Sequence, residues 1–316
     1  MAIQVCLNSG QKMPVIGMGT CSFPPAGKEA TVAAIVEAIR AGYRHFDTAH
    51  AYGTESFLGE AVAKSIQLGL IQSRSQLHIT TKLWCNFATR DKVVPALKNS
   101  LMKLEMDYVD LYLIHWPLGL TREALDLTPP LPREMIVPLD MKSVWEAMEE
   151  TVKLGLARSI GVSNFSIDKL RQILTIASIP PAVNQVEMNP LWRQEKLREY
   201  CNEQGIHITA YSPLGANGTM WGDNRILDSD IITDVAKARE KTPAQVALRW
   251  VYEHGVSFVS KSFNEKRMRE NMEIFDWSLT KEEFEKINTI SYQCKGVKLS
   301  AFFGAHDIVL EIDAEI

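Results

Sequence analysis

Four polar side chains near the ends of strand-like runs could together protonate a carbonyl oxygen: Asp47, Tyr52, Lys82 and His115. A tyrosine alone is a poor acid, because its phenol titrates near ~10. A nearby ammonium favours the phenolate, so Lys82 would make the phenol proton easier to release, and Asp47 would keep that lysine charged. His115 could orient the carbonyl oxygen. The set could therefore polarise and protonate a carbonyl group while a hydride arrives from elsewhere.

Each of these residues also has a purely structural explanation when it is taken singly. Tyr52 could pack in the interior, Asp47 could cap the next helix, and His115 could be a satisfied interior histidine. Lys82 is harder to explain in this way, because a lysine inside an apolar strand needs a negative partner. If the strands are adjacent in a barrel, all four side chains meet at one end, and that arrangement favours catalysis.

Apolar β-rich runs alternate with amphipathic helical patterns along the chain, and these elements must position the four side chains. We predict strands at 45–49, 77–83, 109–116, 157–164, 182–188, 206–212, 257–262 and 274–277, after a hairpin formed by 3–8 and 14–19. Eight strands that alternate with helices predict a parallel sheet, and eight strands close a TIM barrel. The prediction is one α/β domain over residues 1–316, a (β/α)8 TIM barrel with an N-terminal β-hairpin. A doubly wound open sheet is the alternative.

Three longer irregular stretches interrupt this pattern, at 117–138, at 214–229 and beyond Ile290. The βα loops of a TIM barrel surround the mouth of the active site. We therefore expect long loops at the C-terminal face to build the substrate pocket. The tail at 301–316 could cover the barrel mouth or lie on the surface.

A second candidate site lies in the segment SKSFNEKRMREN, residues 260–271. Lys261 and Ser262 end the predicted seventh strand, and Arg267 follows on a helix. TIM barrels commonly bind phosphate near strands 7 and 8, at a helix N-terminus. A lysine and an arginine there suit a phosphomonoester such as a ribose 2′-phosphate. A solvated charged helix is the alternative, and we expect it to hold for Lys266 and Arg269.

Polar side chains at the ends of three further strands could hold a nicotinamide group. Ser163, Asn164 and Gln185 could bind its carboxamide, and the ring of Tyr211 could stack against a flat heterocycle. The following segment SPLG, residues 212–215, offers backbone N–H groups for a pyrophosphate. Ordinary polarity of a barrel interior is the alternative for each of these residues.

The composition excludes several other classes of protein. A hydrophobic fraction of 46% with 23% charged residues is typical of a globular protein with a large core. The net charge of −4 and the lack of a basic stripe give no support for nucleic-acid binding. No apolar stretch is long enough to cross a membrane, and the N-terminus lacks a signal-peptide pattern.

The cysteines indicate neither a disulfide framework nor a metal site. They are odd in number and scattered, with no C-x-x-C pair: Cys6, Cys21, Cys85, Cys201 and Cys294. We expect reduced thiols in a cytoplasmic protein. The histidines show no metal-like spacing with these cysteines, so no bound metal is expected.

Along nearly its whole length the chain resembles the aldo-keto reductase superfamily. The similar segments, in order, are GYRHFDTAHAYG, TKLW, DLYLIHWP, IGVSNF, NQVEMNP, AYSPLG and VSKSFNEKRMREN. The resemblance implies a (β/α)8 barrel whose N-terminal hairpin closes the bottom. It also implies that NADPH binds without a Rossmann fold.

Residue roles follow from the same resemblance. Tyr52 would be the general acid, Lys82 and Asp47 would tune it, and His115 would position the substrate. Ser163, Asn164 and Gln185 would hold the carboxamide, and Tyr211 would stack on the nicotinamide. Lys261, Ser262 and Arg267 would bind the 2′-phosphate, and Glu270 and Asn271 would contact the adenine. The remaining residues expected to bind the cofactor are Thr20, Ser212 and Leu214.

Within the superfamily, the chain is most similar to a plant group that includes chalcone, codeinone, methylecgonone and galacturonate reductases. SVWEAMEE and LRWVYEHGV carry this likeness, and the ending HDIVLEIDAEI is most similar to the galacturonate reductase type. Many aldose-type members have a tryptophan where this chain has Cys21. That difference should widen one wall of the substrate pocket, while Trp84 and Trp116 occupy the other two aromatic positions.

The leading hypothesis is a monomeric, cytoplasmic, NADPH-dependent reductase of a small aldehyde or ketone. Its substrate would be sugar-derived, such as galacturonate, or a plant specialised metabolite. A nucleotide-binding regulatory subunit with little turnover is the second hypothesis. The third is an aldolase that forms a Schiff base on Lys82, although Asp47 with Tyr52 suits a reductase better.

Overall fold

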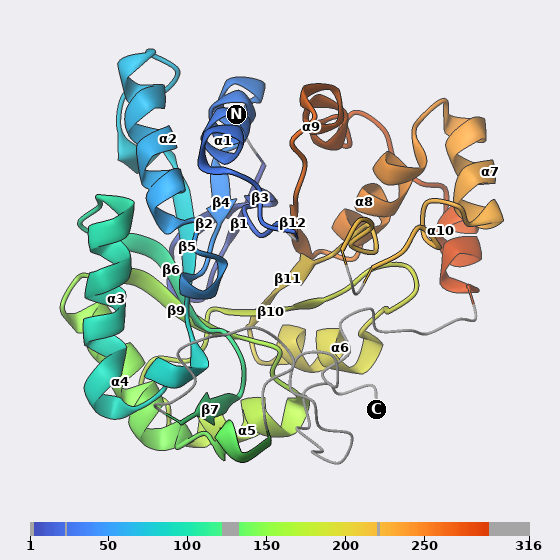
Figure 1. Cartoon of the computed structure of the whole chain (residues 1–316). Helices are drawn as coiled ribbons and strands as arrows, with labels where there is room; N and C mark the ends of the chain where they lie inside the picture. The colour runs from blue at the N-terminus through green and yellow to red at the C-terminus, as the bar shows by residue number, and fades with distance from the viewer. Residues whose placement is uncertain (1–2, 23, 122–132, 220–221, 291–316) are drawn as a thin grey trace.

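The computed structural model describes residues 3–22, 24–121, 133–219 and 222–290. At its centre eight parallel strands form a closed barrel (Figure 1). In order around the barrel they are β3 (Ile16–Gly19), β4 (His45–Asp47), β5 (His78–Leu83), β6 (Val109–Ile114), β9 (Ala157–Ser163), β10 (Val183–Glu187), β11 (His207–Tyr211) and β12 (Ser257–Ser260). The predicted TIM barrel is confirmed, and the open sheet is excluded.

Helices surround the barrel and pack their apolar faces against it (Figure 1). They are α1 (Lys28–Ala41), α2 (Glu55–Gln67), α3 (Arg90–Leu104), α4 (Met141–Lys153), α5 (Ile167–Ile176), α6 (Glu195–Glu203), α7 (Asp230–Arg239), α8 (Pro243–Glu253), α9 (Glu265–Met272) and α10 (Lys281–Asn288). In α1, Val32, Ile35, Val36 and Ile39 are buried at helical spacing. None of the helices in the described ranges is long and apolar enough to cross a membrane.

The N-terminal hairpin and the first barrel strand are separate elements, which corrects the strand prediction. The hairpin pairs β1 (Gln4–Cys6) with β2 (Lys12–Pro14). Residues 16–19, predicted as part of the second hairpin arm, instead form β3 between β12 and β4. Residues 274–277, predicted as the eighth strand, are irregular because β3 already closes the barrel. Ile274 packs into the core from outside the sheet, which accounts for the apolar character of this run.

The long loop after β6 has some regular structure of its own. β7 (Leu118–Leu120) pairs with β8 (Ile136–Pro138) in a small antiparallel sheet, and a short 3₁₀ turn, η4 (Arg133–Met135), leads into β8. Residues 122–132 of this loop, 220–221 of the next and the tail after Ile290 lie outside the described residues. The predictions made for that tail and for Cys294 therefore concern residues that are not described. The other four cysteines are free thiols.

Two buried histidines lie at the N-terminal ends of neighbouring strands. His45 begins β4 and His78 begins β5, and their rings meet edge to face with centroids 4.9 Å apart. His45 contacts the carbonyl of Pro14 and the hydroxyl of Thr80 through its two ring nitrogens, at 3.2 Å each. Burial lowers the pKa of each histidine to about 3. Both rings therefore stay neutral at physiological pH.

We expect the free energy of unfolding to decrease as the pH falls below 6.5. An unfolded histidine titrates near 6.5, whereas His45 and His78 in the folded protein have a pKa of about 3, so the unfolded chain binds more protons in between. Each histidine should lower the free energy of unfolding by roughly 1.4 kcal/mol for every pH unit between these two pKa values. Denaturant unfolding from neutral pH downwards measures the slope. His78→Gln should make it shallower; a slope that is the same in the variant would contradict this assignment.

Candidate active site

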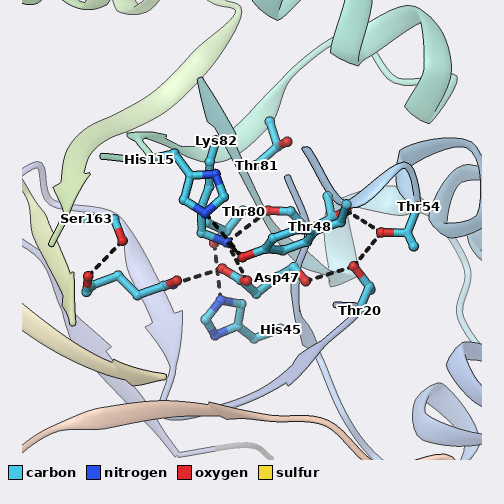
Figure 2. Close-up of polar contacts among 12 residues, drawn as sticks. Thr20, His45, Asp47, Thr48, Thr54, Thr80, Thr81, Lys82, His115 and Ser163 are labelled. Carbon is cyan, nitrogen blue, oxygen red and sulfur yellow. Dashed lines mark hydrogen bonds and ion pairs between the residues drawn. The ribbon is translucent and has the colours of Figure 1, made fainter. Parts of the chain in front are cut away.

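The four predicted catalytic residues come from three neighbouring strands and one short turn. Asp47 is the last residue of β4, Lys82 lies near the end of β5, and His115 directly follows β6. Tyr52 ends the 3₁₀ turn η1 (His50–Tyr52) that follows β4. Because β4, β5 and β6 are adjacent and parallel, their C-terminal ends meet at the mouth of the barrel. Figure 2 shows Asp47, Lys82 and His115 converging there.

The ammonium of Lys82 is the centre of this group. Its Nζ donates to Asp47 Oδ1 at 2.5 Å, to the carbonyl of Thr48 at 3.0 Å and to Tyr52 Oη at 3.3 Å. Tyr52 Oη also lies 3.4 Å from Nε2 of His115. The side chain of Lys82 is 1% exposed. Its three protons therefore have partners, and its charge is balanced by a carboxylate, as burial of a lysine requires.

The pKa of Tyr52 differs in direction from the sequence expectation. Burial raises the pKa of the phenol well above 10, and the negative charge of Asp47 acts in the same direction. The ammonium of Lys82 does not reverse this shift, because its charge is offset by Asp47 and desolvation dominates. The phenol therefore stays protonated at ordinary pH, which is the form that a proton donor needs.

His115 is a neutral imidazole in an aromatic environment. Burial lowers its pKa well below 6.5, and the charge of Lys82 lowers it further. The ring meets Trp84 edge to face at 5.1 Å and stacks near Trp116 at 6.2 Å between centroids. His115 is thus available for hydrogen bonding and does not add a positive charge to the site.

Three buried threonines form a chain of hydroxyl groups beside Asp47 (Figure 2). Thr20 donates to the carbonyl of Asp47 at 3.2 Å, and its hydroxyl lies 2.8 Å from that of Thr54. Thr54 lies 3.0 Å from the hydroxyl of Thr48. Since each hydroxyl has one proton, Thr54 must donate to Thr20, and Thr48 must donate to Thr54. This threonine chain ties the backbone at Asp47 to the start of α2, and these two points lie on either side of the turn that carries Tyr52.

Residue types alone do not identify Thr48 and Thr54 as members of this chain of hydroxyl groups. The available signal was the density of hydroxyl residues around the strand end, in DTAHAYGT. Thr20 was predicted to bind a cofactor. In the structure its hydroxyl takes part in the threonine chain.

The residues predicted to hold a carboxamide lie together next to the tetrad of catalytic candidates, Asp47, Tyr52, Lys82 and His115. Ser163 ends β9, and its hydroxyl donates to the backbone carbonyl of Gln185 in β10 at 2.8 Å. The amide of Asn164 donates to the carbonyl of His115 and to Ser163 Oγ, at 3.1 Å each. Tyr211, at the end of β11, donates to Asn164 Oδ1 at 2.8 Å. Hydrogen bonds therefore connect this cluster directly to the segment that carries His115.

Two of the predicted cofactor residues have a left-handed backbone. Asn164 has φ +64° and Ser212 has φ +50°. This conformation is uncommon for residues other than glycine, particularly for serine, and it often marks a functional loop. At Ser212 it begins a tight turn in which Gly215 N donates to the carbonyl of Ser212 at 3.0 Å. Leu214 is half-buried within this turn.

The basic segment lies after β12, which is the eighth strand of the barrel. Lys261 and Ser262 follow the strand rather than end it, which corrects both the strand number and its boundary. Lys261 and Arg267 are exposed, and neither makes an ion pair within the described part of the chain. Lys266 and Arg269, by contrast, pair with acidic residues of the same helix, as expected for a solvated face.

The start of α9 is well defined, because Asn264 caps the helix by accepting from the backbone N–H of Arg267 at 3.0 Å. Further along α9, Glu270 is half-buried and Asn271 is buried. The amide of Asn271 lies 3.5 Å from the hydroxyl of Ser260 in β12. The helix that carries Glu270 and Asn271 is thereby fixed against the barrel.

Two of the three predicted pocket residues, Trp84 and Trp116, form a wall beside His115. Trp84 and Trp116 are buried and pack with Leu118 and Leu120 of the loop sheet. Cys21 is half-buried, and desolvation raises the pKa of its thiol even though Lys82 is near. Outside this wall lies a cavity of about 300 Å³ between the start of α3, the β7–β8 sheet and the start of α4. None of the four catalytic candidates lines that cavity.

Comparison with known proteins gives consistent matches. A model of the aldo/keto reductase family matches residues 15–291. A D-galacturonate reductase from Fragaria ananassa is 57% identical over 316 residues, covering 100% of this chain and 98% of the relative. An NADPH-dependent codeinone reductase from Papaver somniferum is 53% identical over 286 residues, 90% of this chain and 88% of the relative.

Solved structures agree with these sequence matches. An aldo-keto reductase from Bombyx mori, in complex with NADP, superposes with a TM-score of 0.84 at 35% identity, covering 95% of this chain and 96% of that one. An aldose reductase from Schistosoma japonicum gives a TM-score of 0.86 at 34% identity, with 96% and 97% coverage.

The threonine chain predicts that Thr54→Val destabilises the protein while Thr54→Ser does not. Valine has the same shape but leaves the buried hydroxyls of Thr20 and Thr48 without this partner. We expect the free energy of unfolding to decrease by about 1–3 kcal/mol, as measured by denaturant titration. Serine retains the hydroxyl and is the matched control. Equal losses in both variants would show that the methyl group, not the hydroxyl, matters at this position.

Proposed function

Because the chain belongs to the aldo/keto reductase family, we propose that it reduces an aldehyde or ketone with NADPH and uses Tyr52 as the proton donor. One observation carries this proposal: Tyr52 Oη lies 3.3 Å from Lys82 Nζ and 3.4 Å from His115 Nε2 at the mouth of the barrel. A phenol between an ammonium and a neutral imidazole is suited to binding and protonating a carbonyl oxygen.

The arrangement of protons supports this role for Tyr52. Lys82 donates to the phenol oxygen. A neutral His115 that donates from Nε2 would give the same oxygen a second donor, and the phenol proton would then be free for the substrate. The raised pKa of Tyr52 keeps that proton in place until negative charge develops on the carbonyl oxygen. An alkoxide is far more basic than a phenolate, so transfer of the proton from Tyr52 to the substrate oxygen is still favourable in free energy.

The residues around the tetrad fit a nicotinamide dinucleotide. The side-chain carbonyl of Gln185 has no hydrogen bond within the described residues, so it can accept one from a carboxamide. Ser163 and Asn164 lie beside it, and the ring of Tyr211 could stack on the nicotinamide. When bound, NADPH would supply the hydride.

The phosphate and adenine ends would lie on the turn after β11 and the segment after β12. Ser212 and Leu214 lie in the tight turn that offers N–H groups for the pyrophosphate. Lys261, Ser262 and Arg267 would bind the 2′-phosphate at the start of α9. Glu270 and Asn271, further along that helix, would contact the adenine.

We propose a sugar-derived aldehyde such as D-galacturonate as the first substrate to test, because the relative with that activity is 57% identical over the whole chain. Codeinone reductase, at 53% identity, indicates by its name a very different ketone. Cys21, in place of a tryptophan, would leave more room at one wall of the pocket. Location in the cytoplasm and a monomeric state stay predictions from the sequence.

The aldolase alternative is disfavoured by the contacts of Lys82. A Schiff base requires an amine with a free lone pair, and hence a deprotonated lysine. Lys82 Nζ instead donates to three oxygen atoms, one of them a carboxylate, within a buried site. This geometry supports a structural and electrostatic role for the ammonium.

Replacement of Tyr52 by phenylalanine should abolish most turnover. We expect NADPH oxidation with D-galacturonate, and with a panel of other aldehydes and ketones, to fall by roughly 10²–10⁴-fold. NADPH affinity, measured by fluorescence titration, should change little, because the phenol oxygen acts on the substrate. Turnover that survives in Tyr52→Phe would remove Tyr52 from its role. A wild-type protein that binds NADPH but reduces no carbonyl would favour the regulatory-subunit hypothesis.

Lys261→Met should weaken NADPH binding much more than NADH binding. The variant loses a charge-assisted partner of the 2′-phosphate, and a loss of roughly 10- to 100-fold in NADPH affinity follows. Lys266→Met is the matched control, because Lys266 is exposed on the same segment but pairs with Glu270 at 3.7 Å. Titration of both variants with both nucleotides measures the ratio. An unchanged preference for NADPH in Lys261→Met would overturn the assignment.

A further inference from the structure

A hydrogen bond crosses the barrel and connects the carboxamide cluster, made up of Ser163, Asn164 and Gln185, to the catalytic candidates. Gln185 Nε2 donates to Asp47 Oδ2 at 2.8 Å. The two residues lie 138 positions apart in the sequence. β4, which carries Asp47, and β10, which carries Gln185, are the second and sixth of the eight barrel strands in order, so they stand opposite one another. Asp47 is 3% exposed and Gln185 is 2% exposed.

Gln185 completes the hydrogen bonding of the Asp47 carboxylate. Oδ1 of Asp47 accepts from Lys82, and Oδ2 accepts from Gln185. Rotation of the carboxylate would disturb both bonds, so Gln185 fixes the orientation in which Asp47 meets the ammonium. Lys82 in turn donates to Tyr52. A continuous series of hydrogen bonds therefore runs from Gln185 through Asp47 and Lys82 to the phenol.

The other end of the Gln185 amide is open for a ligand. The backbone carbonyl of Gln185 accepts from Ser163 Oγ and from Asn164 N, which holds this part of β10 in place. No hydrogen bond to its side-chain Oε1 is present in the described part of the chain. A carboxamide N–H that donates to Oε1 would polarise the amide of Gln185. The bond from Nε2 to Asp47 would then strengthen, because hydrogen bonds in series reinforce one another.

We propose that Gln185 is a positioning residue that couples occupancy of the carboxamide site to the orientation of Asp47 and, through Lys82, to the acid Tyr52. The proposal rests on the proposed function for the identity of the cofactor and of the acid. It goes beyond a role in cofactor binding, because the Nε2 group acts on the catalytic carboxylate.

Gln185→Glu tests the donor without changing the size of the side chain. A glutamate carboxylate beside Asp47 is disfavoured by like charge and by burial, so its pKa should be raised. When it is ionised it cannot donate to Asp47; once protonated, its O–H can replace Nε2. The ionisable groups near this end of the barrel include Asp47, Tyr52, Lys82, His115, Tyr211, Cys21, Lys261 and the buried Glu187 at the end of β10.

We expect kcat of Gln185→Glu at saturating NADPH to be low at high pH and to rise roughly tenfold or more as the pH falls from about 8 to about 5.5. The wild type should show no such rise, because Gln185 itself carries no titratable group; burial lowers the pKa of His115 well below 6.5 and raises that of Tyr52 well above 10. A pH profile that is the same in variant and wild type would overturn the proposal.

Gln185→Met removes the donor, and a double-mutant cycle with Asp47→Asn isolates the contact. In the wild-type background we expect Gln185→Met to lower kcat by roughly 10- to 100-fold. In the Asp47→Asn background the same change should cost less than about threefold, because the bond it removes no longer reaches a carboxylate. Equal losses in both backgrounds, or an effect confined to the KM for NADPH, would show that Gln185 serves cofactor binding alone.

The same cycle has a readout that does not require turnover. NADPH affinity should fall less in the double variant than the product of the two single losses predicts, because cofactor and carboxylate act on one amide. Ser163→Ala is the comparison, since it alters the carboxamide cluster but leaves the bond to Asp47; combined with Asp47→Asn, its effect should be multiplicative. If NADPH binds without any carbonyl reduction, the proposed function fails while this cycle still decides the role of Gln185. If the losses of NADPH affinity in Gln185→Met and Asp47→Asn are multiplicative in the double variant, the positioning role of Gln185 is overturned.

Discussion

The ion pair between Lys82 and Asp47 is the interaction on which the rest of the site depends. A lysine that is 1% exposed is tolerated in an apolar strand only when its charge is balanced and its three protons have acceptors. Asp47, the carbonyl of Thr48 and the phenol of Tyr52 supply those acceptors. Pairing of β4 with β5 places the carboxylate within reach of the ammonium, and the need to satisfy that buried ammonium fixes the turn that follows β4. The phenol is located as a consequence of the same requirement.

Two further sets of contacts keep that arrangement in place from opposite sides. The threonine chain ties Asp47 to the start of α2 on one side of the turn that carries Tyr52. Gln185 reaches Asp47 from the far side of the barrel. The threonine chain thus holds the backbone of Asp47, and a strand that is distant in sequence holds its carboxylate. Such support from rigid strands is what a site needs when small displacements of the acid would reduce its efficiency.

Much of this was readable from the sequence, because a strand end is a strong local signal. Asp47, Lys82 and His115 end or follow apolar runs, and parallel strands bring such positions together. The predicted number of barrel strands is correct, but two of the segments are assigned differently in the structure. Residues 16–19, predicted as a hairpin arm, form a barrel strand. Residues 274–277, predicted as a barrel strand, pack outside the sheet. Short apolar runs have the same composition in both settings. Which of the two apolar runs joins the sheet depends on closure of the barrel, which is a property of the whole chain.

Other features depend on burial or on long-range pairing and were not readable. The pKa of Tyr52 moves upwards because desolvation exceeds the influence of Lys82, and neither magnitude can be inferred from residue types. The contact between Gln185 and Asp47 requires the order of strands around the closed barrel. Thr54 was overlooked because its importance comes from two hydroxyl partners on different elements.

The position of β3 has a consequence for how the protein is made. This strand is synthesised before the other seven barrel strands, yet it pairs with β12, which is synthesised last. Until β12 arrives, the nascent sheet has two open edges, and open edges are prone to pair with other chains. Asp47 belongs to the early part of the sheet and Gln185 to the late part, and their contact crosses the interior of the barrel. Closure of the barrel and completion of the site are therefore late events in the biogenesis of this protein.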